Sequence, residues 1–350
     1  MVAQGGRACA LPLAILGNVI AILGGGIIGL SIAWRLAQRG FDVTVFDARR
    51  RGGEASRAGA GMLAPGGEFV GDTVWTPLGL ESHALYPGYV AELGEESGCA
   101  IDFRICGGVE VAASVEDWPG LRERALRQAA AGIASREIGE GILYPNDGYV
   151  DSPQVVSALR RACEKRGVAL VDGLVAEIDA DRSEAIVIAA GAWSSDIVVT
   201  ARGAKLTLPK TIPVKGHLLG YQLEPGSLPR ILRHGHTYML QRANGYTIAG
   251  SSEERIGFNT DVDESICRGI HARCRELWPG LAGHEPCDHW IGFRPATEDT
   301  RPKIGRHEDS NVWLAYGHYR NGILLAPLTA RRIAAGVADA AKNECTSNRR

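Results

Sequence analysis

Closely spaced cysteine pairs are missing from this 350-residue sequence. It contains no Cys-x-x-Cys pair, which argues against a zinc ribbon and against a redox dithiol. Thiols scattered in this way favour reduced cysteines in a cytoplasmic protein, and no metal site is expected. The eight cysteines are Cys9, Cys99, Cys106, Cys163, Cys267, Cys274, Cys287 and Cys345.

An excess of positive charge is missing too. The chain has 38 Lys and Arg against 40 Asp and Glu, a formal net charge of -2. A nucleic-acid partner favours a basic face, so none is expected. The apolar run Ala8–Leu16 is interrupted by Pro12 and too short to span a membrane, so no membrane partner is expected. Residues 1–18 are predicted to be a dispensable extension, with a secretory signal as the alternative.

Length and composition indicate a globular chain with more than one unit. Hydrophobic residues make up 45% and charged residues 22%, which is ordinary for such chains. At 350 residues the chain exceeds the size at which a single core stops growing, so two interleaved domains are expected. The 45 glycines predict many tight turns and close backbone approaches.

A dinucleotide-binding motif lies near the start of the chain. The apolar run Val19–Leu23 predicts a strand buried on both faces, and Gly24-x-Gly26-x-x-Gly29 follows it. Gly24 makes the tight turn, Gly26 lets the backbone approach a pyrophosphate, and Gly29 lets the next helix pack on the strand. Asp47 ends the following strand, where a carboxylate accepts hydrogen bonds from ribose hydroxyls. The motif alone does not distinguish FAD from NAD.

The remaining pattern predicts alternating helices and strands. Ser152 is a candidate N-cap with Pro153 at the first helical position, and Asn244-Gly245 between two apolar runs predicts a β-hairpin. Residues 49–67 lack periodicity and predict a long functional loop. Predicted helices span 28–39, 80–97, 118–131, 152–166, 261–277 and 324–341; predicted strands span 41–47, 168–171, 185–190, 238–242 and 246–249.

Three segments carry a resemblance to a known family. They are residues 52–62 (Gly-Gly-Glu-Ala-Ser-Arg-Ala-Gly-Ala-Gly-Met), the Arg-Pro-x-Thr-x-Asp segment within 292–305, and 317–327 (Gly-His-Tyr-Arg-Asn-Gly-Ile-Leu-Leu-Ala-Pro). With the glycine motif, they resemble the D-amino-acid oxidase family of FAD-dependent flavoproteins. The last segment is most similar to the thiamine-pathway glycine oxidases. The resemblance extends in order and spacing over nearly all of 19–340.

The resemblance implies an α/β fold in which a Rossmann-like FAD-binding domain of the GR2 type is interleaved with an antiparallel-sheet α+β substrate domain. The FAD-binding domain is expected over 19–80, 145–205 and 290–342, and the substrate domain over 81–144 and 206–289. Residues 1–18 and 343–350 are expected to be disordered.

The resemblance also implies the site residues. Arg294, Arg320 and Tyr238 match substrate-contacting positions, and a planar guanidinium suits a carboxylate. No catalytic side chain is expected beyond the flavin, and His318 is interpreted as part of a turn. Positions matching cofactor contacts are Gly24, Gly26, Ile27, Ile28, Gly29, Asp47, Ala48, Ala55, Ser56, Ala60, Gly61, Met62, Val175, His318, Tyr319, Asn321, Gly322, Ile323 and Leu324.

The implied reaction is the oxidation of glycine or another small amino acid, with dioxygen as acceptor, in a possible homotetramer that serves thiamine synthesis. A D-amino-acid dehydrogenase, a sarcosine- or proline-type oxidase, and a flavin-binding module without such activity remain alternatives. The chain departs from the family at Asp47, where Glu is usual, and at 251–254, where Ser-Ser-Glu-Glu replaces an apolar residue. Residues 289–304 contain no cysteine, so non-covalent FAD is expected.

Overall fold

The computed structural model describes residues 17–48, 52–68 and 75–347. The glycine motif lies as predicted between β1 (Gly17–Leu23) and α1 (Ile27–Ala37), and β2 (Val43–Asp47) follows. β1 pairs in parallel with β2, so these three elements form the predicted βαβ unit.

A six-stranded sheet contains this unit, in the order β19-β20-β11-β1-β2-β9. All of its strands pair in parallel except β19, which is antiparallel to β20 at the edge. Ile20 and Ile22 on β1 pack into one apolar cluster, whereas Ala21 and Leu23 pack into another, so both faces are buried. The other strands are β9 (Ala169–Asp172), β11 (Ser183–Ile188), β19 (Lys303–Arg306) and β20 (Val312–Tyr316).

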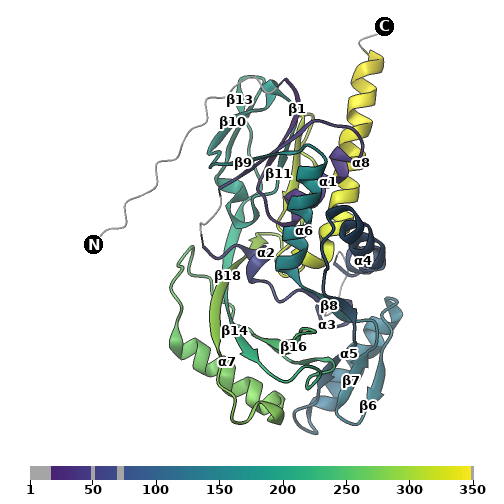
Figure 1. Cartoon of the computed structure of the whole chain (residues 1–350), viewed down its shortest axis with the longest axis vertical. Coiled ribbons are helices and arrows are strands. Elements are labelled where there is room, and N and C mark those ends of the chain that lie inside the picture. Colours follow the sequence, from purple (N-terminus) through teal and green to yellow (C-terminus); the bar gives the residue numbers. More distant parts are fainter. Residues whose placement is uncertain (1–16, 49–51, 69–74, 348–350) are drawn as a thin grey trace, which may run out of the picture.

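Four helices cover one face of this sheet: α1, α4 (Trp75–Ser97), α6 (Ser152–Lys165) and α8 (Gly322–Ser347) (Figure 1). Tyr89 on α4 bonds Ser31 on α1 at 2.7 Å, and Ser82 on α4 donates to the carbonyl of Leu324. The opposite face carries a small sheet of β10 (Glu177–Asp179), β12 (Val198–Ala201) and β13 (Ala204–Lys205).

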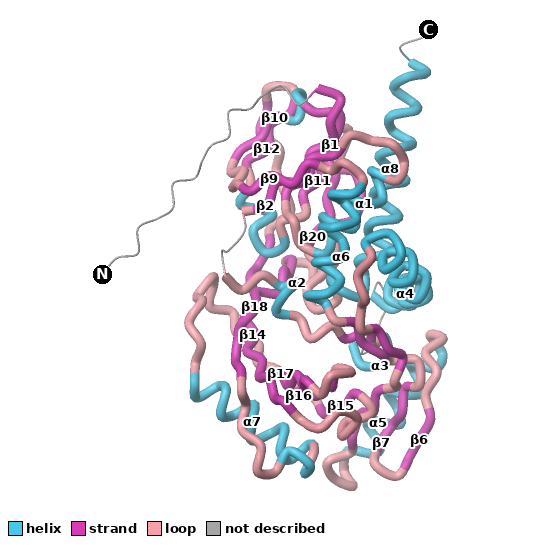
Figure 2. Tube along the Cα trace, in the orientation of Figure 1, coloured by secondary structure: helices cyan, strands magenta, loops and turns pink. Residues whose placement is uncertain are grey.

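A second, eight-stranded sheet has the order β18-β14-β17-β16-β15-β5-β7-β6 (Figure 2). Every pair in it is antiparallel except β15 with β5. The predicted hairpin is confirmed as β16 and β17, with Gly245 at a φ of 85° in the turn. The strands are β5 (Gly108–Val111), β6 (Arg136–Ile138), β7 (Gly141–Tyr144), β14 (Thr211–Gln222), β15 (Ile231–His234), β16 (Thr237–Gln241), β17 (Tyr246–Gly250) and β18 (Asp288–Thr297).

The remaining elements connect or cover these sheets, and β3, β8 and β4 form a three-stranded sheet of their own. Apolar side chains of α7 pack on the eight-stranded sheet, where Ile270 and Cys274 meet Leu219 and Tyr221 of β14. These elements are α2 (Ala55–Ala58), β3 (Met62–Leu63), α3 (Pro65–Glu68), β4 (Phe103–Ile105), α5 (Asp117–Ala130), β8 (Gly148–Val150), η1 (Ala180–Arg182), η2 (Gly191–Asp196), α7 (Glu264–Leu277) and η3 (Pro279–Leu281).

Three local predictions need correction. Asp151, not Ser152, caps α6: its carboxylate accepts from the amide of Gln154 at 3.1 Å, while the Ser152 hydroxyl donates to the carbonyl of Gly59. The predicted loop at 49–67 contains α2 and β3, although residues 49–51 lie outside the described part. The predicted disorder of residues 343–350 is wrong for 343–347, where α8 continues through residues that include neither Gly nor Pro.

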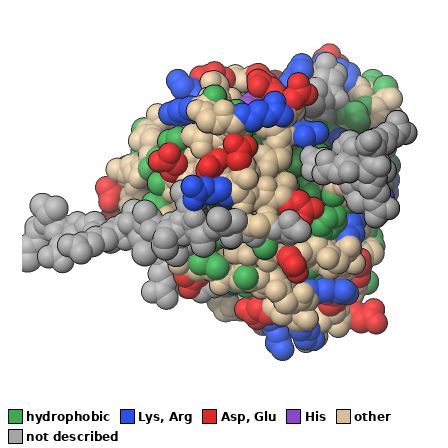
Figure 3. All heavy atoms as spheres, turned by 90° about the horizontal axis from the view of Figure 1, so that it is seen from above, with side chains coloured by type: hydrophobic (Ala, Val, Ile, Leu, Met, Phe, Trp, Pro, Cys, Tyr) green, Lys and Arg blue, Asp and Glu red, His purple; other side chains and the backbone are tan. Residues whose placement is uncertain are grey.

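Two segments pack differently from the predicted domains, which placed 81–97 in the substrate domain and 290–297 in the FAD-binding domain. Residues 81–97 belong to α4, which packs with α1, α6 and α8, and residues 290–297 belong to β18 of the eight-stranded sheet. Residues 1–16 and 348–350 lie outside the described residues. No helix among the described residues is both long and apolar enough to cross a membrane. Positive and negative side chains are interspersed on the face shown in Figure 3.

Candidate functional site

A cavity of about 290 Å³ lies at the carboxyl ends of β1, β2, β11 and β20 and reaches β14, β16 and β18 of the second sheet. Carboxyl ends of parallel strands are where α/β folds bind ligands. The wall comes from residues 23–28, 46–48, 54–56, 58–62, 173–176, 189–193, 196–197, 216, 218, 238, 292–295, 315–316, 318–320 and 322–323.

The glycine turn forms one end of this cavity. Gly24 has a φ of 116°, and a Cβ there would lie 2.4 Å from the carbonyl oxygen of Ala189. A Cβ on Gly29 would lie 1.9 Å from the carbonyl oxygen of Gly24. Gly29 therefore packs α1 against the turn, outside the cavity wall, while Gly24 and Gly26 line the wall. Because Gly24 and Gly26 carry no side chains, a pyrophosphate can approach the backbone here.

The amino end of α1 faces the cavity at Ile27 and Ile28. The amide of Ile27 donates to the hydroxyl of Ser56 at 3.0 Å, which fixes the loop around α2 to this helix end. The first turn of α1 has no acidic residue, so the positive end of the helix dipole is not compensated there. This arrangement suits an anionic group such as a phosphate.

Asp47 lines the cavity beyond the glycine turn, together with Ala48 and Val175. Its carboxylate lies 3.6 Å from the guanidinium of Arg160 on α6. Asp47 is the last residue of β2, next to the carboxyl end of β1, so the sheet brings the glycine turn and this carboxylate together. The ribose-binding role of Asp47 stays a prediction, and the carboxylate lies in the wall where that role requires it.

Ala60, Gly61 and Met62 form the middle of the wall, with Ala55 and Ser56 before them. Gly61 has a φ of 87°, and a Cβ there would lie 1.9 Å from the carbonyl oxygen of Val150. Arg242, a buried residue that the sequence analysis missed, donates to the carbonyl of Ala60 at 2.6 Å. Burial lowers the pKa of Arg242, and the carboxylate of Asp151 opposes this. The only sequence signal for Arg242 was its place at the predicted hairpin.

Arg294 and Tyr238 line the part of the cavity that the eight-stranded sheet forms. Arg294 is half-buried on β18 and donates to the carbonyl of Ser252 at 3.0 Å and to the hydroxyl of Ser251 at 2.9 Å. A Cβ on Gly216 of β14 would lie 2.3 Å from the Arg294 guanidinium, so glycine makes room for it. Tyr238 is buried and lies against Gly250, its partner in register.

Tyr319 and Arg320 follow β20 and line the same part of the cavity. Tyr319 has a φ of 49°, an uncommon conformation for a residue with a side chain. Burial raises the pKa of Tyr319 to about 12, and a hydrogen bond to Glu253 acts in the same direction. Arg294 and Arg320 both lower the pKa of that hydroxyl, so both guanidinium groups act on this one side chain.

His318 begins the turn before α8 and is buried. Its Nε2 atom bonds the hydroxyl of Thr329 at 3.0 Å, and burial lowers its pKa to about 4. The hydrogen bond to Thr329 thus fixes the imidazole to the first turns of α8, next to the cavity wall. The backbone N–H of Asn321 donates to the carbonyl of His318 at 2.8 Å.

The structure brings nearly all predicted site residues into one cavity wall. The exceptions are Gly29, Asn321 and Leu324, which lie behind the wall. Sequence analysis missed Trp193 and Phe293, which also line it. Their rings lie 6.1 Å apart, edge to face, and Phe258 stacks on Trp193 at 5.0 Å. No short motif marks such a contact, because its three members come from distant segments.

The residues present fit an FAD cofactor. One end of the cavity offers bare glycine backbone, a helix amino end and a ribose-side carboxylate, and the rest offers mostly apolar walls. The six cysteines whose side chains are described are free thiols, and none lines the cavity. Within the described ranges, no group of three or more His, Cys, Asp or Glu side chains could hold a metal ion.

A glycine turn at a helix end and an acid on the neighbouring strand suit the binding of a dinucleotide, and the family match shows that this dinucleotide belongs to a flavin-dependent oxidoreductase. The chain belongs to the family described as FAD dependent oxidoreductase (DAO), whose model matches residues 20–335. FAD is therefore its cofactor.

Individual proteins similar to this chain carry more specific names than the family does. The chain is 31% identical to the glycine oxidase of Geobacillus kaustophilus over 90% of its length and 91% of that protein. It is 34% identical to the bifunctional protein ThiO/ThiG of Synechocystis sp., covering 90% of this chain but spanning only 50% of that longer relative. The crystal structure of glycine oxidase from Geobacillus kaustophilus superposes with a TM-score of 0.85 at 28% identity, over 92% of this chain and 95% of that one.

Proposed function

We propose that this protein oxidises glycine, or another small amino acid, to the imino acid, which water hydrolyses to the 2-oxo acid and ammonia. The observation that supports this most directly is the guanidinium of Arg294, which lies in the cavity wall between β14 and β18, with Tyr238 and Tyr319 in the same wall. The glycine oxidases that the chain resembles support the choice of substrate.

Arg294 binds the substrate carboxylate in this proposal. A guanidinium is always charged and presents two parallel N–H donors to two carboxylate oxygens. Arg320 adds a second positive charge near the same end, and the Tyr238 hydroxyl adds a donor. Bound FAD would supply the two-electron redox chemistry, with the substrate Cα–H as the electron source and dioxygen, reduced to hydrogen peroxide, as the final acceptor. The side chains contribute orientation, because positioning of this kind supplies several kcal/mol of a barrier.

FAD is held without a covalent bond in this proposal. The predicted contacts divide between the glycine turn with Ile27 and Ile28, the carboxylate of Asp47, the segment 55–62, Val175, and the turn 318–324. The absence of a cysteine from the described cavity wall supports non-covalent binding. Acid precipitation should therefore release all of the yellow colour into the supernatant.

The cellular setting is proposed on the same basis. We infer a cytoplasmic homotetramer that supplies dehydroglycine for the thiazole of thiamine, with dioxygen as the electron acceptor. The kinship with bifunctional ThiO/ThiG proteins supports a place in that pathway. The division into an FAD-binding domain and a substrate domain also remains a proposal, with α4 assigned to the first.

Anaerobic titration tests the reaction. The purified yellow protein should lose its visible absorption when glycine is added without air, and oxygen should restore it while hydrogen peroxide and glyoxylate accumulate. Bleaching by larger D-amino acids, sarcosine or proline but not by glycine would favour the alternative oxidases or dehydrogenase. A yellow protein that no amine bleaches would instead be a flavin-binding module.

A further inference from the structure

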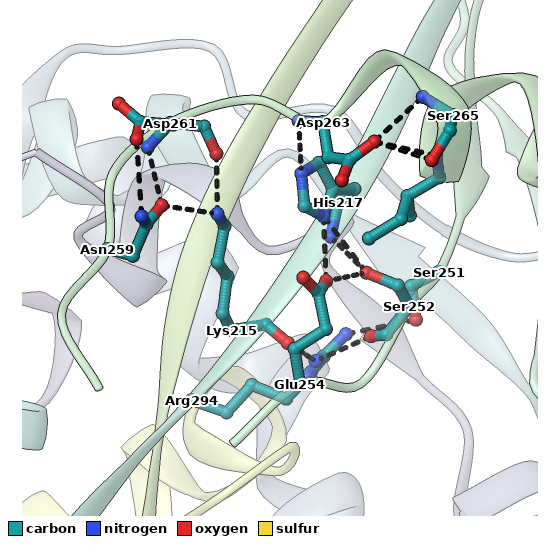
Figure 4. A network of polar contacts seen from close by, with 11 residues as sticks. Lys215, His217, Ser251, Ser252, Glu254, Asn259, Asp261, Asp263, Ser265 and Arg294 are labelled. Atoms are coloured by element: carbon teal, nitrogen blue, oxygen red, sulfur yellow. Dashed lines mark hydrogen bonds and ion pairs between the residues drawn. The ribbon is translucent and has the colours of Figure 1, made fainter. Parts of the chain in front are cut away.

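The two partners of the Arg294 guanidinium come from one short segment. Ser251 and Ser252 follow β17 directly and begin the connection to α7, residues 251–263, which we call the strap. The Ser251 hydroxyl accepts from Nη2 at 2.9 Å, and the Ser252 carbonyl accepts from Nη1 at 3.0 Å (Figure 4). The direction of the Arg294 fork therefore depends on where the strap begins.

A polar network under the strap fixes that beginning. The Ser252 hydroxyl donates to the Glu254 carboxylate at 2.6 Å and accepts from the backbone amide of His217 at 2.9 Å. The Nδ1 atom of His217 lies 2.8 Å from the same carboxylate oxygen. Glu254 also exchanges two backbone hydrogen bonds with Lys215, each 2.9 Å long.

The partners of His217 define its tautomer. The backbone amide of Asp263 can only donate, and it reaches Nε2 of His217 at 2.9 Å. Nε2 is therefore the acceptor nitrogen and Nδ1 carries the proton, which it donates to Glu254. Every polar atom of the buried imidazole is thus bonded, and the ring joins the first residues of the strap to its last residue.

The far end of the strap is held by the same strand. The Lys215 ammonium, on a side chain that is 2% exposed, donates to the Asn259 side chain at 3.0 Å and to the Asp261 carbonyl at 2.5 Å. Lys215 and His217 are two residues apart on β14, so their side chains lie on one face of it (Figure 4). Two adjacent inward positions of β14 thus hold both ends of the strap.

Burying these polar groups costs free energy that apolar side chains of similar volume would not cost at the same positions. The arrangement places one serine hydroxyl and one carbonyl against the two terminal nitrogens of Arg294, which apolar residues could not do. We propose that His217, Ser252 and Glu254 form a positioning relay that sets the direction of the Arg294 fork and thereby the affinity for the substrate carboxylate. This inference rests on the proposed role of Arg294, which the proposal above assigns to carboxylate binding.

Acetate is a suitable probe, since it carries the carboxylate of glycine but has no amine to oxidise. Its dissociation constant is measured by titrating the FAD-loaded protein and following the visible flavin spectrum, with no turnover involved. Glu254→Gln keeps the volume but removes the charge that orders both Ser252 and His217. We expect it to weaken acetate binding about tenfold, the effect of misdirecting one charge-assisted hydrogen bond. FAD content and the thermal midpoint serve as folding checks.

Two substitutions of His217 separate positioning from bulk stability. His217→Asn can still present a donor near the Nδ1 position, whereas His217→Gln places its amide near Nε2. We expect His217→Asn to bind acetate more tightly than His217→Gln. Equal weakening in both would overturn the role of the Nδ1 bond and with it the relay. Should Glu254→Gln fail to fold, Ser252→Ala, which removes the hydroxyl that joins Glu254 to the amide of His217, must weaken acetate binding or the inference fails.

The matched control is Glu264→Gln on α7, the same substitution at a side chain that is 85% exposed. It should bind acetate like the wild type. Arg294→Met separates the carboxylate-binding role of Arg294 from the role of the relay. If it binds acetate as tightly as the wild type, the proposed function fails. If it loses acetate while Glu254→Gln and both His217 variants bind normally, only the relay is refuted.

Discussion

The hydroxyl of Ser56 accepts a hydrogen bond from the backbone amide of Ile27 at 3.0 Å. This contact joins the first turn of α1 to α2, which begins the segment lining the middle of the cavity. It links the glycine motif at 24–29 to the segment 52–62. The amino end of α1 and the loop around α2 therefore form one continuous surface of the cavity.

Ser56→Ala tests this link. Loss of the hydroxyl removes a hydrogen bond of about 1 kcal/mol, so the dissociation constant for FAD should rise several-fold. The measurement is reconstitution of the apoprotein followed by flavin fluorescence quenching. The control is Ser157→Ala at an exposed position of α6, which should leave FAD affinity unchanged. Unaltered affinity in Ser56→Ala would show that the loop holds its place without this bond.

Arg294→Lys should impair substrate binding while retaining FAD. An ammonium cannot replace a planar two-donor fork, so kcat/KM for glycine should fall by roughly 100-fold, about 2 to 3 kcal/mol. Steady-state peroxide assays with the FAD-saturated enzyme provide the measurement. Arg122→Lys, on the exposed face of α5 and paired with Glu137, is the matched control and should behave like the wild type. A normal kcat/KM in Arg294→Lys would contradict the assigned role.

Gly29→Ala should be strongly destabilising although alanine favours helices. Its Cβ would lie 1.9 Å from the carbonyl oxygen of Gly24, a backbone atom of the cofactor turn. The thermal midpoint and the FAD content should both fall. Gly88→Ala is the same change within α4, where a Cβ meets nothing within 4 Å. That variant should be stabilised by about 0.5 to 1 kcal/mol, and a similar gain in Gly29→Ala would refute the packing argument.

His318 should make stability depend on pH. Burial lowers its pKa from 6.5 to about 4, so between these values the unfolded chain binds a proton that the folded chain does not. The free energy of unfolding therefore rises with pH across this window, and on acidification this group removes about 3 kcal/mol. Denaturant unfolding of the wild type and His318→Gln at several pH values measures the difference. The variant should have the shallower dependence; parallel curves would exclude His318 as a source.

Much of the nucleotide side could be predicted because its signals are local. Val19–Leu23, the glycine spacing and Asp47 lie within one βαβ unit, whose geometry is nearly invariant. The hairpin at Asn244-Gly245 was equally local, since a tight turn demands those residues. The error at Ser152 has a local cause too: Asp151 precedes it and is an equally good cap, and only the contact of Ser152 with Gly59 decides between them.

The supports of the site could not be predicted in this way. Arg242 reaches Ala60 across 182 residues, and Arg294 reaches Ser252 across 42. The Arg294 contact depends on the pairing of β14 with β17 and β18, which no periodicity specifies. The polar segment 251–254 was recognised as a departure from the family, but its contact with Arg294 emerged only from the fold.

The cavity wall also imposes an order on cofactor loading. Residues 24–28 are synthesised long before residues 315–323, which complete the same wall. β20 must add beside β11, and β18 beside β14, before the walls meet. A nascent chain halted before residue 315 thus presents a glycine turn without its enclosure, and the complete wall forms only after residues 315–323 have been added.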